Sequence, residues 1–224
     1  MTTSLPSRRR PAILLALVLI GSFVASALLA VVIYAPGLNA PFMSIYTPAE
    51  LEATGQSTAA AEQLIDIVEQ LAADHPDKFA VATSVADVRR QFAAGLVSLP
   101  MGMENGSPID GNIDNVRHFY DRGIRYLSLS HGSNNHLSDS SYDETTRWDG
   151  ISDFGAEVIR EMNRLGIMID VAHVSDEAFW EIMQITEAPV IASHSSARHF
   201  TPGFERNVSD EMIVAIAESG GVVQ

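Results

Sequence analysis

The chain has 224 residues, with 28 acidic against 14 basic side chains and a formal net charge of −14. A hydrophobic content of 46%, with ordinary numbers of glycine and proline, is typical of a folded protein and excludes a disordered or collagen-like chain. The absence of cysteine excludes disulfide scaffolds, zinc fingers, iron–sulfur sites and thiol nucleophiles. The acidic balance argues against a nucleic-acid partner, because phosphate backbones would repel this chain.

An uncharged, mostly apolar run from Ala12 to Ala35 follows three arginines at positions 8–10. A helix of that length covers about 36 Å, enough to cross a hydrocarbon core of roughly 30 Å. The arginines place the N-terminus in the cytoplasm. We therefore predict a basic tip and a transmembrane helix within residues 1–36, which contacts the lipid bilayer through residues 12–35. The alternative is a cleaved signal peptide, since Ala25-Ser26-Ala27 resembles a cleavage site.

Residues 37–224 form the second predicted domain, which would be extracytoplasmic, either periplasmic or at the cell surface. In this domain short apolar runs alternate with amphipathic stretches, which indicates a parallel sheet in an α/β fold. The predicted strands are Phe42–Tyr46, Val97–Met103, Ile124–Leu129, Ile167–Ala172, Pro189–Ala192 and Gly221–Val223. The predicted helices are 59–74, 85–94, 112–122, 153–165, 176–187 and 209–219, and capping signals occur at Thr47, Ser84, Ser175 and Ser209.

Four successive predicted strands are each followed by a carboxylate or an imidazole, namely Glu104, His131, His173 and His194. Parallel α/β barrels build their active sites at this end of the strands. One histidine at a strand end is usually a hydrogen-bonded structural residue, but four such side chains in succession favour a shared metal or acid–base site. Imidazole and carboxylate without thiolate suit zinc or a related divalent ion. Glu104, His173 and His194 would form a three-ligand set that leaves a position for water.

Several motifs around these residues resemble the membrane (renal-type) dipeptidases of peptidase family M19. The similarity extends from about residue 40 to the end of the chain. The motifs that carry it are Leu129-Ser130-His131, Asn163-Arg164-Leu165-Gly166, Asp170-Val171-Ala172-His173-Val174-Ser175, Ser193-His194-Ser195-Ser196-Ala197, Arg206-Asn207 and Gly220-Gly221-Val222-Val223.

The resemblance implies a (β/α)₈ TIM barrel of the metal-dependent hydrolase type, which holds two zinc ions and hydrolyses dipeptides with a metal-activated water. Glu104 would bridge both metals, and His173 and His194 would complete the second site. His131 would contact the substrate and stabilise charge on the attacked carbonyl oxygen, so Glu104 and His131 are the implied catalytic residues. Arg206 would hold the free carboxylate of the substrate through its planar donor fork. Its structural alternative is an exposed loop arginine.

The chain departs from the family pattern at the first strand, which in the family carries a His-x-Asp pair for the first metal. His75-Pro76-Asp77 has this spacing, but we interpret it as a turn that ends a helix. A late family aspartate would lie beyond Gln224. We therefore expect an incomplete barrel, with about six of eight strands, and at most one well-liganded zinc site.

Three functions fit these observations. The leading one is a membrane-anchored zinc dipeptidase. The second is a non-catalytic remnant that binds one metal or a partner, which the absent His-x-Asp pair favours. The third is a barrel amidohydrolase that acts on a non-peptide amide, in which Arg206 would have no carboxylate to hold. The sequence leaves a homo-oligomer open.

Overall fold

The computed structural model describes residues 38–224. Its central feature is a six-stranded sheet in which every neighbouring pair is parallel and the strand order is β1-β4-β5-β6-β7-β8. The predicted α/β class is therefore confirmed, with six parallel strands in the main sheet. The strands are β1 (Met43–Tyr46), β4 (Met101–Glu104), β5 (Ile124–Ser128), β6 (Met168–Asp170), β7 (Ile191–Ala192) and β8 (Val222–Val223).

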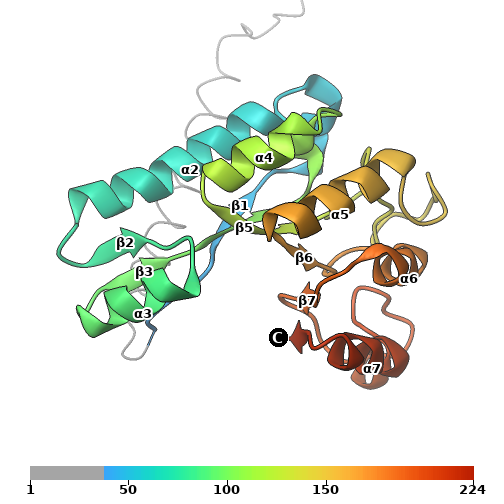
Figure 1. Ribbon diagram of the computed structural model, residues 1–224. Helices are drawn as coiled ribbons and strands as arrows, with labels where there is room; N and C mark the ends of the chain where they lie inside the picture. The colour runs from blue at the N-terminus through green and yellow to red at the C-terminus, as the bar shows by residue number, and fades with distance from the viewer. Residues whose placement is uncertain (1–37) are drawn as a thin grey trace, which may run out of the picture.

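Helices connect these strands, and all of the labelled α-helices except the one at residues 85–93 follow one another in an arc along one side of the sheet (Figure 1). Parallel strands need such crossovers, because a tight turn cannot join them. The α-helices of the described residues are α2 (Ser57–Asp74), α3 (Val85–Ala93), α4 (Asp114–Asp121), α5 (Asp153–Leu165), α6 (Asp176–Ile185) and α7 (Asp210–Glu218). The same part of the chain contains the 3₁₀ helices η1 (Ala49–Thr54), η2 (Ser107–Ile109) and η3 (Arg198–Phe200).

The predicted strand Val97–Met103 is divided in the structure. Its first half is β3 (Val97–Leu99), which pairs in parallel with β2 (Phe79–Val81) in a separate two-stranded sheet. Pro100 lies between β3 and β4 and has no N–H to donate to a ladder, which accounts for the break. The prediction of one continuous strand was wrong, and β2 was not predicted.

Serine caps start four of the helices. The hydroxyls of Ser84, Ser152, Ser175 and Ser209 each accept a hydrogen bond from a backbone N–H in the first turn. The caps predicted at Ser84, Ser175 and Ser209 are thus confirmed. The one predicted at Thr47 is wrong, because η1 begins at Ala49 with Pro48 as its N-cap residue and no side-chain cap, and α2 starts only at Ser57. Helix α2 ends at Asp74, so His75 lies in a helix-ending turn, as predicted.

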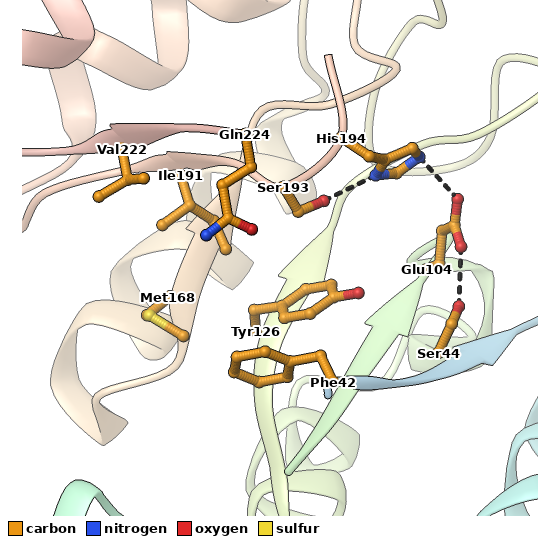
Figure 2. Close-up of a pocket in the computed structure, with 10 residues that line it drawn as sticks. All are labelled: Phe42, Ser44, Glu104, Tyr126, Met168, Ile191, Ser193, His194, Val222 and Gln224. Atoms are coloured by element: carbon orange, nitrogen blue, oxygen red, sulfur yellow. Dashed lines mark hydrogen bonds and ion pairs between the residues drawn. The ribbon is translucent and has the colours of Figure 1, made fainter. Parts of the chain in front are cut away.

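The two faces of the sheet have different surroundings. Alternate residues such as Ile45, Met103 and Leu127 are buried in the core that the sheet shares with the helices. Residues on the other face line a cavity of about 480 Å³, which includes Tyr126 and Glu104 (Figure 2). The C-terminal end of this second face carries the polar residues described below.

The predicted membrane-spanning run, residues 12–35, lies outside the described residues and stays a prediction, as does the localisation that depends on it. Within residues 38–224 we find no helix that is both long enough and apolar enough to cross a bilayer.

Candidate metal and active site

The four polar residues predicted at the strand ends lie together. Glu104 is the last residue of β4, and His131, His173 and His194 follow β5, β6 and β7 within three residues. Parallel pairing in register brings these strand ends to one edge of the sheet, since Glu104 is level with Ser128 and Ser128 with Asp170. Residues up to 90 positions apart in the chain therefore meet in one cluster.

Glu104 lies at the centre of this cluster. Its Oε1 atom is 3.3 Å from His131 Nε2, 3.2 Å from His173 Nε2 and 3.1 Å from His194 Nε2. The Nε2 atoms of His173 and His194 are 2.8 Å apart. The other carboxylate oxygen, Oε2, accepts a hydrogen bond of 2.7 Å from Ser44 on β1 (Figure 2). Ser44 therefore holds one oxygen while the other faces the three imidazoles.

The ionisation states of these residues favour metal binding. Burial alone would raise the pKa of Glu104, but its contacts with His131, His173 and His194 and the hydrogen bond from Ser44 lower it well below its ordinary value of 4.5. Burial lowers the pKa of His173 below 6.5, and the positive charge of Arg206 acts in the same direction. Ionised carboxylate and neutral imidazole are the forms that bind a metal.

The donor set and its spacing fit a small divalent cation. Glu104, His131 and His173 offer ligand atoms that lie within 4.8 Å of one another, and His194 lies against Glu104 and His173. Ligands placed 2.0–2.1 Å from a tetrahedral zinc would be separated by about 3.3 Å, close to the separations observed. The structure thus brings together the predicted set of Glu104, His173 and His194, and adds His131 at a comparable distance.

His173 has an unusual backbone and a nitrogen without a partner. Its φ of +73° falls in the left-handed region, which side chains with a Cβ rarely adopt. Its Nδ1 atom is buried and has no hydrogen-bond partner among the described residues. The ring is instead packed against His131 and Tyr142, with centroid separations of 4.1 and 5.8 Å.

Arg206 reaches the same cluster from the segment between η3 and α7. Its guanidinium donates to the carbonyl oxygen of His194 at 2.8 Å and to the hydroxyl of Ser195 at 3.0 Å, and lies 3.1 Å from His173 Nε2. It lines a second cavity of about 450 Å³, together with Tyr142 and His194. Arg206 is almost fully buried, so the alternative of an exposed loop arginine is wrong.

A long segment between β5 and α5 covers one side of the cluster, and two buried polar side chains organise it. The carboxylate of Asp139 accepts hydrogen bonds from the backbone N–H groups of Arg147, Trp148 and Gly150. Asn135 binds Leu129 O through its Nδ2 atom, while its Oδ1 atom accepts from two backbone N–H groups. The segment therefore has fixed geometry, which places Tyr142 beside the site.

Sequence reasoning assigned no role to Ser44, Ser193, Asp170 or Tyr142. Asp170 and Ser193 belong to motifs quoted above, so their presence beside the predicted metal-binding histidines was a signal for supporting contacts. Ser44 and Tyr142 gave no such signal, because their proximity to the site depends on strand pairing and on the path of a long loop.

Comparison with known proteins identifies the family. The model of the membrane dipeptidases, peptidase family M19, matches residues 33–224. This chain therefore belongs to the M19 membrane dipeptidase family.

Individual relatives agree with this assignment. An uncharacterized dipeptidase of Schizosaccharomyces pombe is 34% identical over 76% of this chain and 42% of its own length. The dipeptidase aclJ of Aspergillus oryzae is 34% identical over 83% of this chain and 46% of its own length. The chain thus spans a little under half the length of these relatives.

Solved structures share the fold. The probable dipeptidase PvdM from Pseudomonas aeruginosa superimposes with a TM-score of 0.79 at 27% identity, over 83% of this chain and 50% of that one. A metallopeptidase from Rhodobacter sphaeroides, solved with a phosphinate mimic of the dipeptide L-Ala-D-Ala, gives a TM-score of 0.73 at 26% identity, over 81% and 59%. The six-stranded sheet therefore corresponds to part of the structures of this family.

Proposed function

We propose that this chain carries the metal-binding and substrate-binding part of a zinc-dependent dipeptidase, which hydrolyses the peptide bond of dipeptides with a free carboxylate. The observation that carries the proposal is the convergence of three imidazoles on one carboxylate oxygen at the ends of four strands. Family membership and the dipeptide mimic bound by the Rhodobacter sphaeroides relative support the choice of substrate.

Glu104, His173 and His194 are the proposed metal ligands. Their donor chemistry suits zinc, and their mutual distances fit its coordination geometry. When bound, zinc supplies Lewis acidity, which activates a water and polarises an amide carbonyl. Ser44 orients the carboxylate of Glu104 toward the two histidines.

His131 and Arg206 are the proposed substrate-binding residues. The His131 ring packs against that of Tyr46, with the two centroids 4.6 Å apart. From this position the imidazole can lie near the carbonyl oxygen of the substrate, which gains negative charge during the reaction. The guanidinium of Arg206 lines the neighbouring cavity, where it would bind the carboxylate of a dipeptide. This cavity lies within the size range of small-molecule sites.

The sequence favours one metal site. His75-Pro76-Asp77, which has the spacing of the family's first-metal pair, ends helix α2 and does not belong to the cluster. A chain that binds one zinc without turnover would match the alternative of a metal-binding remnant.

The test is metal analysis of the purified full chain together with hydrolysis of L-Ala-D-Ala. We expect stoichiometric zinc and a turnover that is lost in His194→Ala. His131→Ala separates two roles for His131: if it contacts the substrate, zinc content stays and turnover falls, whereas if it is a ligand, zinc content falls. His75→Gln is the matched control and should change neither quantity. Absence of turnover at every zinc concentration would refute the proposed activity.

A further inference from the structure

Asp170 is a fully buried carboxylate at the end of β6, and it lies beside the proposed metal site without facing it directly. Its Oδ1 atom accepts hydrogen bonds from the backbone N–H groups of Ala172 and Ser193, both at 3.0 Å. Its Oδ2 atom accepts from the hydroxyls of Ser128 at 2.9 Å and Ser193 at 2.7 Å. These four hydrogen bonds compensate the carboxylate for the loss of water, since a buried carboxylate without partners would destabilise the fold.

These contacts determine the direction of the next hydrogen bond. A carboxylate only accepts, so the hydroxyl of Ser193 must use its single proton to donate to Asp170. The Ser193 Oγ atom is also 2.8 Å from His194 Nδ1 (Figure 2). Because its proton is already used, Ser193 can only accept from His194, so the ring proton lies on Nδ1. In the neutral imidazole Nε2 is then unprotonated, and its lone pair lies 3.1 Å from Glu104 Oε1.

We propose that Asp170 is a positioning residue that acts through Ser193 to fix the tautomer and the orientation of His194, so that Nε2 is available to a metal. The inference rests on the proposed function for the identity of the ligand, but the hydrogen-bond direction follows from this structure alone. Metal-binding histidines commonly donate their second ring N–H to such a partner. Here a serine is interposed between the histidine and the carboxylate.

His194 needs this support more than His173 does. The side chain of His194 is 45% exposed, whereas that of His173 is 6% exposed and is packed between two rings. Packing therefore orients His173, although its Nδ1 atom has no partner among residues 38–224. His194 packs against one ring only, that of His173, with centroids 4.8 Å apart, and the bond to Ser193 Oγ is the contact that orients its Nδ1 side.

Asp170→Asn should reverse the hydrogen-bond chain. Two backbone N–H groups occupy the Oδ1 position, so the amide oxygen of asparagine must stay there and its NH₂ group must take the Oδ2 position. The NH₂ group would donate to Ser193, whose hydroxyl would then donate to His194 Nδ1. The ring proton would move to Nε2 and block the ligand position. Ser193→Ala removes the link without imposing the wrong tautomer.

The first test measures the tautomer directly in the metal-free full chain. In mildly alkaline buffer, imidazole ¹⁵N chemical shifts should show His194 with its proton on Nδ1, and the proton should move to Nε2 in Asp170→Asn. The signals are assigned by their loss in His194→Ala. A wild-type His194 that carries its proton on Nε2 would overturn the proposal. This result does not depend on turnover, so it stands even if the proposed dipeptidase activity fails.

The second test measures the zinc dissociation constant by competition with a chromophoric chelator. We expect a loss of about 10-fold for Ser193→Ala and up to about 100-fold for Asp170→Asn, and recovery in Ser193→Thr, which keeps the hydroxyl. The matched control is Ser128→Ala, because Ser128 donates to the same Asp170 oxygen but does not contact His194. Equal affinities in Asp170→Asn and Ser128→Ala, with both chains folded by circular dichroism, would refute the positioning role.

Discussion

The two oxygens of Glu104 show how single contacts specify the site. Ser44 holds Oε2, and this leaves Oε1 directed at three imidazoles. Ser44 lies on the exposed face of β1, two residues before the strand ends. A serine on a neighbouring strand thus sets the orientation of the central carboxylate, and its contribution is visible only once the strands are paired.

The pKa shifts of the cluster predict how the stability of the metal-free chain depends on pH. Burial lowers the pKa of His173 below its ordinary 6.5. As the pH falls, the unfolded chain therefore protonates this histidine at a higher pH than the folded chain does. The free energy of unfolding should therefore fall as the pH drops below 6.5. Glu104 contributes stability that is fully present above its ordinary pKa of 4.5 and is lost below that pH.

Urea denaturation across this pH range is the measurement. His173→Asn should remove the first decrease and leave the second, since asparagine tolerates the left-handed backbone and does not titrate. An unfolding free energy that stays constant or rises as the pH falls below 6.5 would contradict the assignment.

At the scale of elements, the segment between β5 and α5 depends on Asp139. This carboxylate is buried and satisfies three backbone N–H groups. Asp139→Ala should leave these donors unpaired and destabilise the chain by about 2–4 kcal/mol, since each buried unpaired group costs about 1–3 kcal/mol and water can recover part of the loss. Hydrogen exchange at Arg147, Trp148 and Gly150 should become fast. Unchanged protection of these amides would show that the segment is held by other contacts.

The elements also show what the sequence could and could not predict. Helix starts with a serine cap followed by an acid, such as Ser175 and Ser209, were found because the signal is local. The break at Pro100 was missed because an apolar run on both sides resembles one strand. Strand β2 was missed because its three residues gain stability only from pairing with β3.

The site was predicted in the same uneven way. Glu104, His131, His173 and His194 were found because parallel strands bring their C-terminal ends together. The Ser193 link between Asp170 and His194 was not predicted, since it depends on rotamers and on atomic distances. Side-chain chemistry and strand order therefore identify the candidate ligands, whereas the contacts that support them require coordinates.

At the scale of the whole molecule, the proposed ligands connect separate parts of the sheet. Glu104 belongs to β4, and His173 and His194 follow β6 and β7. A bound zinc would therefore link strand ends that the chain reaches through different helices. A ligand that binds only the folded state stabilises it by about 2.7 kcal/mol at a free concentration of 100 times its Kd.

We expect zinc to raise the Tm of the full chain by about 5–10 °C under these conditions. Differential scanning calorimetry with and without zinc is the measurement. His194→Ala, whose side chain is largely outside the core, should unfold near the wild-type Tm without zinc and gain little from it. An equal zinc-induced increase in both chains would indicate that the ion binds elsewhere.

The left-handed backbone at His173 also limits the evolutionary paths open to this strand end. Any residue that replaces His173 must adopt the left-handed backbone conformation, whatever its side chain does. Glycine, asparagine and aspartate adopt this conformation most easily. A descendant that no longer needed the imidazole would drift toward those three residues and away from valine or isoleucine. The residue type found at this position in a divergent relative would then record whether its site had been released from selection.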